Sequence, residues 1–421
     1  MTSYSDSLVR KRWKKLAYGW QGVDWLLFVL PVAVTIFASI LIGSTQKYTG
    51  ETGFAINHAL LGAVGLVLSL WIARGRYEVL LQWRWFIYLA TIAALVAVMA
   101  IGTEGLGAQR WIPILGFNVQ PSEFAKLGAI ITLAATLKDR DAPTLFGMIK
   151  ALAITAVPWA LVFLQPDLGT SLVFGAITIG MLYWSGTHPG WLILMISPLV
   201  SAIVFNISLP VWIGWVILIG VIAYRSLTWW PLFSAVVAVV INSVSGKLGD
   251  VMWGVLKDYQ KDRLILFLHP DRDPLGGGYH LIQSRIAIGA GELWGRGLFH
   301  GTQTQLSFIP EQHTDFIFSA VGEELGFIGG MGLLLAFWLI CLRLVLIAQS
   351  AKDNFGSLLA VGVLSMIVFQ VILNICMTIG LAPITGIPLP WMSYGRSALL
   401  TNFIAIGLVE SVANHRRRLK Y

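Results

Sequence analysis

Long apolar runs, each about the length of a membrane-spanning helix, follow one another along most of this chain. A helix needs about 20 predominantly apolar residues to cross the hydrocarbon core of a bilayer. Runs of that kind recur over residues 24–413, with one long polar interruption. Breaks at charged residues, glycines and prolines predict helices that begin near residues 25, 54, 84, 121, 147, 168, 190, 210, 229, 315, 356 and 395.

The predicted fold class is therefore an all-α polytopic membrane protein with about 10–12 transmembrane helices. The lower count stays open because the three runs over residues 189–245 are short and are separated by very brief turns. The polar interruption, residues 246–314, is longer than any connection between spans requires. Its aromatic and apolar residues predict one long folded extracytoplasmic loop, packed on the membrane domain.

Composition supports a membrane protein and excludes several other classes. Hydrophobic residues make up 57% of the chain and charged residues only 12%. Cys341 and Cys376 both lie in apolar runs, which argues against disulfides or a thiolate metal site. The net charge of +8 comes mainly from segments between the runs, so we expect no nucleic-acid partner. Residues 25–43 follow a basic cluster as in a signal peptide, but their length predicts a retained first span.

The basic residues of the short connections predict the orientation, because Lys and Arg near span ends are held preferentially in the cytoplasm. With both termini cytoplasmic, one face collects Arg74, Arg76, Arg84, Lys138, Arg140, Arg225, Arg343, Lys352 and the basic tail. The predicted parts are a cytoplasmic N-terminus (1–23), a transmembrane domain (24–413) and a cytoplasmic tail (414–421). The outer face then carries the segments richest in unusual polar residues, which are residues 102–120, 165–167, 246–314 and 383–392.

Asp273 is the first candidate for chemistry. It precedes Pro274, which favours an extended backbone, and three glycines follow that allow close approach to a ligand. An extended aspartate beside glycines is well presented to a substrate. The competing interpretation is a turn in which Asp273 hydrogen-bonds its own backbone.

A second candidate site combines Arg110 with the start of the span at residue 121. Glu123 and Lys126 are three residues apart, so they share one helix face. Ionisable groups within a membrane helix are costly and mark functional or paired positions. Alternatively, Pro121 only starts the helix and Lys126 extends to the interface.

Other polar residues near span starts have structural explanations. Asp167 is expected to cap the span that follows it. The sequence favours a functional and a structural role for it equally. Thr314 and Asp315 are expected to cap the span near residue 315, while Glu311 and His313 match no familiar metal motif. Glu323 and Glu324 lie about two turns inside that span, where buried carboxylates need partners. We expect Arg or Lys residues on neighbouring helices to supply them.

Several motifs, taken in order, carry a resemblance to a known family. They are Gln109-Arg-Trp111 with Gln120-Pro-Ser-Glu-Phe-Ala-Lys126, Gln165-Pro-Asp-Leu-Gly-Thr170, Asp273-Pro-Leu-Gly-Gly-Gly-Tyr-His280 with Ile282-Gln-Ser284, Pro310-Glu-Gln-His-Thr-Asp-Phe-Ile-Phe318, and Pro388-Leu-Pro-Trp-Met-Ser-Tyr-Gly395. From the first span to the last, the chain resembles the SEDS family, named for shape, elongation, division and sporulation. The Gly301-Thr-Gln-Thr-Gln305 run is more similar to the elongation members than to the division members.

The resemblance implies a peptidoglycan glycosyltransferase of the bacterial inner membrane that polymerises lipid II during cell elongation and shape maintenance. The implied partners are lipid II, a class B penicillin-binding protein that crosslinks the product, other elongation-complex membrane proteins and membrane lipids. The site faces the periplasm or exterior. The resemblance implies no organic cofactor and leaves room for a divalent cation, Mg²⁺ or Mn²⁺, at Asp167.

The resemblance also implies roles for residues. Asp273 matches the family's key loop aspartate and is the candidate base, while Arg110 and Lys126 would stabilise the leaving pyrophosphate. Glu123 would hold Lys126 in place. The remaining candidates for binding substrate are Asp167, Tyr279, His280, Gln283 and Ser284.

Two departures from the family pattern and two rival functions remain. About thirty additional residues between Asp167 and Tyr259 predict an extra helical hairpin within residues 190–245, and Arg396 stands where many members have glycine. A lipid II flippase would need polar residues at all membrane depths, whereas here they gather at the outer side. A scaffold that only recruits a transpeptidase would leave the outer motifs unexplained.

Overall fold

The computed structural model describes residues 22–47, 53–105, 108–114, 117–139, 144–226, 230–255, 278–306 and 311–416, together with residues 261, 266, 267, 273, 308 and 309. The long helices are α2 (Trp25–Thr45), α3 (Gly53–Arg74), α4 (Val79–Ile101), α5 (Pro121–Leu137), α6 (Leu145–Leu164), α7 (Leu168–Trp184), α8 (Pro189–Ile207), α9 (Leu209–Ser226), α10 (Pro231–Val255), α14 (Ile317–Ser350), α15 (Asn354–Ile379) and α16 (Arg396–Asn414). Two shorter helices are α12 (Tyr279–Ala290) and α13 (Thr302–Gln305).

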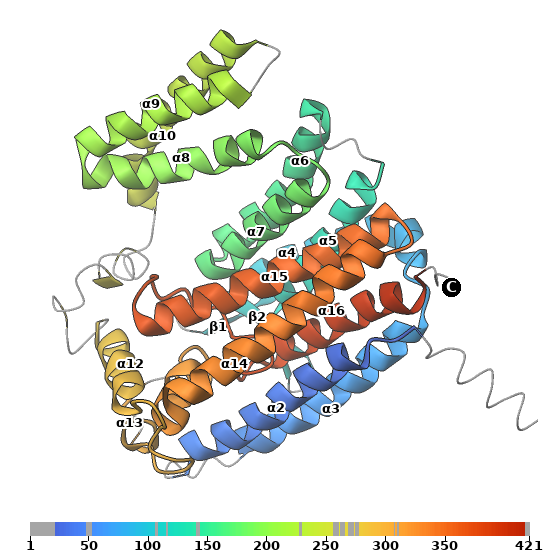
Figure 1. Ribbon diagram of the computed structural model, residues 1–421, viewed down its shortest axis with the longest axis vertical. Coiled ribbons are helices and arrows are strands. Elements are labelled where there is room, and N and C mark those ends of the chain that lie inside the picture. The colour runs from blue at the N-terminus through green and yellow to red at the C-terminus, as the bar shows by residue number, and fades with distance from the viewer. Residues whose placement is uncertain are drawn as a thin grey trace, which may run out of the picture.

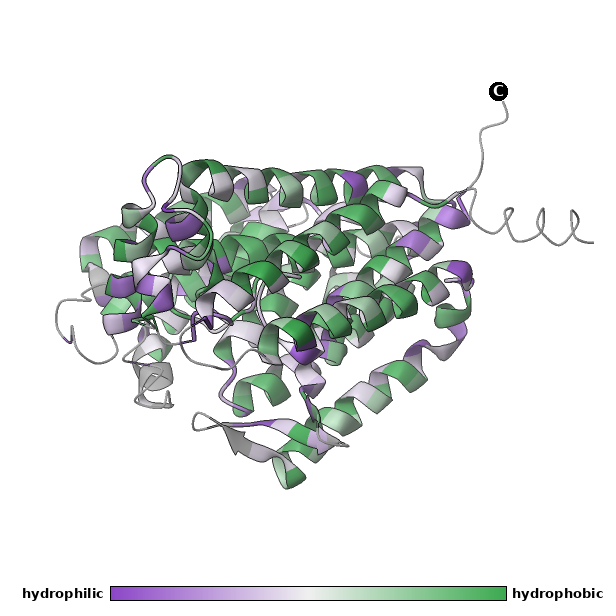
Figure 2. Ribbon diagram, turned by 90° about the horizontal axis from the view of Figure 1, so that it is seen from below, coloured by the Kyte–Doolittle hydropathy of each residue, from purple (hydrophilic) through white to green (hydrophobic). Residues whose placement is uncertain are grey.

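The long helices form an elongated bundle with their axes roughly side by side, while α8, α9 and α10 stack at one edge next to α6 and α7 (Figure 1). Their starts lie within about five residues of those the apolar pattern predicts, which confirms the all-α membrane architecture. Within the described residues, ten helices are long and apolar enough to cross a membrane. The other two long helices, α5 and α7, have 17 residues each, close to the lower limit for a span. Polar residues gather mainly towards the helix ends and connections (Figure 2).

A small antiparallel sheet connects α4 to α5, which the sequence pattern did not predict. Its strands are β1 (Thr103–Gly105), β2 (Ala108–Ile114) and β3 (Phe117–Val119), in the order β1-β2-β3. The register pairs Glu104 with Gln109 and Ile112 with Val119. This sheet fixes the position of Arg110, which lies on the central strand.

The centre of the bundle is occupied by α15 and α16, and the other helices surround them. In its most apolar window, α16 has 83% of its residues buried, compared with 17% for α4. A Cβ atom at Gly407 of α16 would lie 2.8 Å from the backbone oxygen of Ser69 in α3. Small residues at helix interfaces allow this close approach, as is typical of membrane proteins.

Polar contacts join the helices at the end that carries the basic connections. The Arg343 Nε donates to Asp24 Oδ2 at 2.7 Å, and the Asp24 backbone N–H donates to Glu410 at 3.0 Å. Nearby, the Tyr77 hydroxyl donates to Asp353 at 3.1 Å. Burial first, and then the Asp353 carboxylate, raise the pKa of Tyr77, so the phenol stays protonated and remains a donor. These contacts tie α2 to α14 and α16, and the connection between α3 and α4 to α15.

The segment assigned to the long loop contains ordered structure. α10 continues through Gly246 to Val255, so the predicted loop boundary was too early. Further on, α12 packs against α14 and α15 through Ser284, whose hydroxyl donates to the Thr378 carbonyl at 2.7 Å and lies 2.6 Å from the Ser319 hydroxyl. The residues from 278 to 306 are therefore folded against the bundle, and the extracytoplasmic position of the loop stays a prediction.

The same segment pairs with a break in α14. Gly326 has a φ of +64°, which interrupts the helix and which glycine adopts without steric cost. The backbone N–H groups of Arg296 and Gly297 donate to the carbonyls of Glu323 and Glu324, both at 2.9 Å. Backbone groups released at the break are thus satisfied by the loop, as a buried backbone requires.

We predict that Gly407→Ala lowers the thermal unfolding temperature, because its methyl group meets the α3 backbone. Overpacking of this kind costs about 1–3 kcal/mol. The matched control is Gly175→Ala in α7, where a Cβ atom would meet nothing within 4 Å. Intrinsic fluorescence during heating reports both variants. An equal unfolding temperature for Gly407→Ala and wild type would contradict the close packing of α3 on α16.

Candidate functional site

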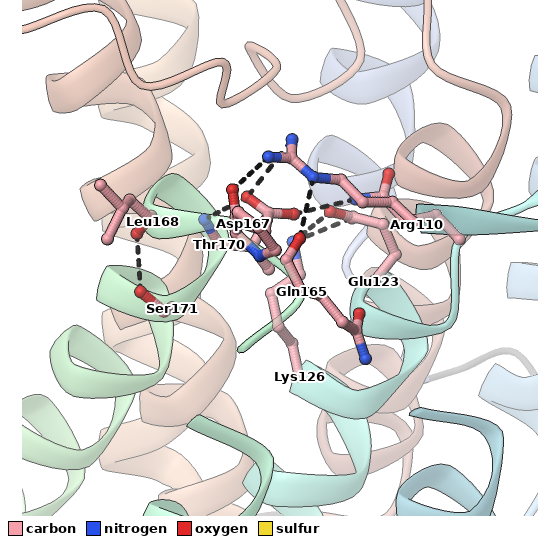
Figure 3. A network of polar contacts seen from close by, with 10 residues as sticks. Arg110, Glu123, Lys126, Gln165, Asp167, Leu168, Thr170 and Ser171 are labelled. Carbon is pink, nitrogen blue, oxygen red and sulfur yellow. Dashed lines mark hydrogen bonds and ion pairs between the residues drawn. The ribbon is translucent and has the colours of Figure 1, made fainter. Parts of the chain in front are cut away.

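Arg110 connects the sheet to the turn between α6 and α7. Its guanidinium donates to the carbonyl of Gln165 at 3.4 Å and also to the carbonyl of Pro166, and its Nη1 lies 3.9 Å from Asp167 Oδ1. Carbonyls at a helix C-terminus attract a cation, because they lack helical partners. Figure 3 shows Arg110 reaching across this turn. The arginine is thereby held in one orientation.

Asp167 has the structural role that the sequence left open, and its functional role stays a prediction. Its Oδ1 accepts from the Thr170 backbone N–H at 3.2 Å, which makes it the N-cap of α7. Its Oδ2 accepts from the Gln120 amide at 3.3 Å. Two residues on, a Cβ atom at Gly169 would lie 2.5 Å from the Thr385 carbonyl oxygen. The absence of a side chain at Gly169 therefore allows the segment before α16 to pack closely against α7.

Glu123 and Lys126 form a buried ion pair in the first turns of α5. The Lys126 Nζ donates to both carboxylate oxygens of Glu123 at 2.8 Å, and the two side chains are 2% and 1% exposed. This geometry confirms that the two charges share a helix face. Pro121 occupies the first turn of α5, where its missing N–H costs nothing. Figure 3 shows the pair beside Asp167 and Gln165, and the Gln120 amide, just before α5, donates to Asp167.

The segments predicted to share one face meet at one end of the bundle. The Gln120 backbone N–H donates to the Ser397 hydroxyl at 2.8 Å, joining the sheet to α16. The Tyr394 backbone N–H donates to the His313 carbonyl at 2.8 Å, which joins the motif before α14 to the motif before α16. Residues far apart in sequence therefore surround one polar region.

The candidates from the long loop lie on separate segments, Asp273 before α12 and the others on α12 itself. Asp273 is exposed, and its carbonyl accepts from the Gly278 backbone N–H at 3.0 Å. Residues 271, 272 and 274–277 on either side lie outside the described residues, so the juxtaposition of Asp273 with Arg110 stays a prediction. Tyr279, His280 and Gln283 lie on α12, where the His280 ring stacks on Phe316 at 6.0 Å.

Ser284 has a different environment from the one its predicted role requires. The side chain is fully buried, and its hydroxyl is engaged in the contacts between α12, α14 and α15. It thus holds the helix that carries the other loop candidates. Its assignment as a substrate-binding residue finds no support in this geometry.

Two expectations for the start of α14 were wrong. Glu323 accepts from the backbone N–H groups of Gln303 and Thr304 at 2.8 and 2.9 Å, and Glu324 accepts from Ser44 and from the Phe299 backbone. Their partners among the described residues are thus backbone amides and the hydroxyls of Ser44, Thr302 and Thr304 rather than Arg or Lys, because the loop backbone folds over the break in α14.

The helix itself begins later than expected. Phe316 is at the N-cap of α14, so neither Thr314 nor Asp315 caps it. The Thr314 hydroxyl instead donates to the Glu311 carboxylate at 2.9 Å.

Among the described residues, no three His, Cys, Asp or Glu side chains form a group that could hold a metal ion.

Three contributors to the polar region were missed as site residues. Gln120 and Ser397 link the charge pairs to α16, and Arg396 donates to the Tyr394 hydroxyl at 3.3 Å. The Arg396 guanidinium also lies 5.5 Å from the centre of the Phe117 ring, a cation–π contact between α16 and β3. Gln120 and Ser397 stood in motifs, but their contact spans 277 residues, which no local pattern reveals.

Comparisons with known proteins agree with this architecture. The family model FTSW_RODA_SPOVE, described as a cell cycle protein, matches residues 22–214 and 210–418. "Peptidoglycan glycosyltransferase MrdB" of Escherichia coli K12 is 34% identical over 410 residues, covering 96% of this chain and 97% of the relative. "Peptidoglycan glycosyltransferase RodA" of Treponema pallidum is 35% identical over 427 residues, covering 94% and 98%.

Solved structures share the fold. One chain from a study of polymerization and crosslinking by a peptidoglycan synthase complex has a TM-score of 0.72 and 26% identity, covering 94% of this chain and 98% of that one. The rod shape determining protein RodA of Thermus thermophilus has a TM-score of 0.63 and 23% identity, covering 95% and 99%. The family match over nearly the whole length confirms the resemblance in the motifs, and the chain belongs to the FtsW/RodA/SpoVE family, the SEDS proteins.

Proposed function

We propose that the chain is a peptidoglycan glycosyltransferase, which polymerises lipid II into glycan strands during cell elongation. Support comes from membership of the SEDS family and from the two relatives named as peptidoglycan glycosyltransferases, which align with this chain over nearly their full lengths. The observation in the structure that carries the proposal is the pairing of four charged groups, Arg110 with Asp167 and Glu123 with Lys126, at one end of an apolar bundle. Charges placed within a membrane domain are expensive and mark function.

In the proposed reaction, Asp273 accepts the proton of the acceptor sugar hydroxyl. That oxygen attacks the anomeric carbon of the second sugar chain, and the bond to undecaprenyl pyrophosphate breaks. The pyrophosphate leaves with the bonding electrons, so its negative charge grows in the transition state. Cations fixed beforehand at that position lower the barrier, because they need not reorganise during the reaction.

Arg110 and Lys126 are the cations that we assign to the leaving group. Arg110 is oriented by carbonyls at the end of α6 and remains 20% exposed in its side chain. A guanidinium has five N–H donors, which leaves capacity for phosphate oxygens. Lys126 donates to both oxygens of Glu123, which supports its role as a fixed cation.

The carboxylates next to these cations are poor donors for the expected Mg²⁺ or Mn²⁺. Both oxygens of Asp167 accept hydrogen bonds, and Oδ1 also faces Arg110. Glu123 uses both oxygens on Lys126. The proposed mechanism therefore contains no step through a metal ion, and the cation remains a prediction.

The proposed setting is the bacterial plasma membrane, with both termini cytoplasmic and the polar site at the periplasmic or outer face. The basic connections at the opposite end of the helices support this orientation. The proposed partner is a class B penicillin-binding protein, supported by the similarity to a chain of a peptidoglycan synthase complex. Such a partner would crosslink the strands as they form.

We predict that Asp273→Ala and Asp273→Asn abolish polymer formation from purified lipid II in the presence of the cognate transpeptidase. Both variants remove the carboxylate base, and asparagine keeps the shape of the aspartate side chain. Loss of a general base reduces rates by about 10²–10⁴-fold. Product length on gels is the measurement. Asp139→Asn is the matched control, because Asp139 is also exposed but lies between α5 and α6, at the other end of the bundle.

The same preparation separates the enzyme from a flippase. Normal polymerisation by both Asp273 variants would remove Asp273 from the mechanism. A wild-type protein that makes no polymer but moves lipid II across vesicle membranes would be a transporter. A protein that does neither, yet still recruits the transpeptidase, would be a scaffold.

We predict that Lys126→Met strongly destabilises the protein, whereas the double variant Glu123→Gln with Lys126→Met recovers stability but does not polymerise lipid II. Removing one partner of a buried ion pair leaves an uncompensated charge and costs about 3–5 kcal/mol, while replacing both can be neutral. Thermal unfolding and polymer formation are measured on both variants. Full activity in a stable double variant would make the pair purely structural.

A further inference from the structure

A cavity of about 1200 Å³ lies between α6, α8, α9 and α10, away from the Arg110 cluster. Its lining includes Thr144, His188, Arg225 and Trp230, and we call the end of the cavity at these four residues its mouth. These residues stand at the start of α6 and α8, at the end of α9 and just before α10, which is the end of the bundle that carries the basic connections. The cavity therefore opens on the membrane side opposite to the proposed catalytic site.

The cavity extends through only half of the membrane. Its deepest lining residue on α10 is Asn242, twelve positions after Trp230, and on α6 it is Leu152, eight positions after Thr144. At 1.5 Å per residue these distances are about 18 and 12 Å, compared with a hydrocarbon core of about 30 Å. A transmembrane helix would need a groove of full depth. A molecule from one leaflet fits the observed depth.

Hydrogen bonds close the deep end of the cavity. The Asn242 Nδ2 donates to the Ser197 hydroxyl at 3.0 Å, and the Ser201 hydroxyl donates to the Asn242 carbonyl at 2.6 Å. The Trp212 indole N–H donates to Ser201 at 2.9 Å. Polar side chains of this kind join helices inside membranes. Here they hold α8, α9 and α10 together and give the cavity a fixed floor.

The walls between mouth and floor are apolar and accessible. Ile149 is 53% exposed and Phe233 is 64% exposed, and Leu194 and Val237 continue the lining. At the mouth, Arg225 is exposed and forms no ion pair with any residue that the structure describes. Trp230, which is 71% exposed, has the side chain favoured at lipid headgroups.

We propose that this cavity binds an anionic phospholipid from the leaflet at the basic ends of the helices. The headgroup phosphate pairs with Arg225, and an acyl chain lies along the walls of α6 and α10 as far as the Asn242 floor. Charge complementarity at the mouth, apolar walls and half-membrane depth together select a lipid over a partner helix. The lipid fills the space between α6 and the unit formed by α8, α9 and α10.

The test uses the full chain in lipid nanodiscs that contain equal amounts of phosphatidylglycerol and phosphatidylcholine. Native mass spectrometry after release measures the lipid that stays bound. We expect the wild type to retain phosphatidylglycerol preferentially, and Arg225→Gln to reduce that retention about fivefold, as expected for the loss of one basic residue near an anionic headgroup. Ser234→Trp, which fills the cavity, is expected to remove both lipids.

Arg74→Gln is the matched control, because Arg74 is also an exposed arginine at this end and does not line the cavity. Its lipid retention should equal that of the wild type, and thermal unfolding confirms that each variant is folded. Equal retention of both lipids by the wild type, or no change in Arg225→Gln, would overturn the proposal. Retention of a copurified single-span polypeptide in place of lipid would also overturn it. The readout does not depend on polymerisation, so it stands apart from the proposed enzymatic activity.

Discussion

The rest of the structure depends on one constraint, which is that every buried charge or polar group needs a partner within the protein. The contact between Lys126 and Glu123 illustrates it. An ammonium group that is 1% exposed must be neutralised where it lies, since neither water nor lipid can do so. The pair occupies the first turns of α5, and Gln120 just before it reaches Asp167 and Ser397. The same short segment therefore places α5 against α7 and α16 and neutralises the charges of Glu123 and Lys126. A site for an anionic leaving group can be built on such a framework with little reorganisation.

The same constraint applies to the backbone where helices are interrupted. Gly326 breaks α14, and the carbonyls released there accept from Arg296 and Gly297 of the preceding segment. The Glu323 carboxylate then accepts from the backbone at α13. Irregular backbone at membrane depth is tolerated only when protein groups satisfy it. The break thus anchors the segment that continues from α12, the helix with the loop candidates.

The two ends of the bundle have different chemistry. At one end, charge pairs, the small sheet and α12 provide groups suited to sugar hydroxyls and pyrophosphate. At the other, Arg343 with Asp24 and Tyr77 with Asp353 tie helices together, while Arg225 remains available to a lipid headgroup. The proposed catalytic site and the proposed lipid cavity therefore lie at opposite ends of the bundle and use different residues.

The sequence by itself determined the order and approximate starts of the long helices and limited their number to about 10–12, because span length and apolarity are properties of continuous segments. It also singled out Glu123 and Lys126, since charged residues within a membrane span stand out locally, and Arg110 and Asp167, which stand in polar motifs between apolar runs. Tertiary structure alone decided their partners. Nothing near Arg110 in the chain indicates the carbonyl of Gln165, 55 residues away.

Other features depended on contacts that no local pattern carries. Glu323 and Glu324 were expected to meet cations, but a folded-back loop supplies amide donors instead. Ser284 was expected to bind substrate, whereas the structure shows it buried against α14 and α15. In each case the residue type indicates that the side chain needs a hydrogen-bond partner. The tertiary fold determines which partner lies close enough.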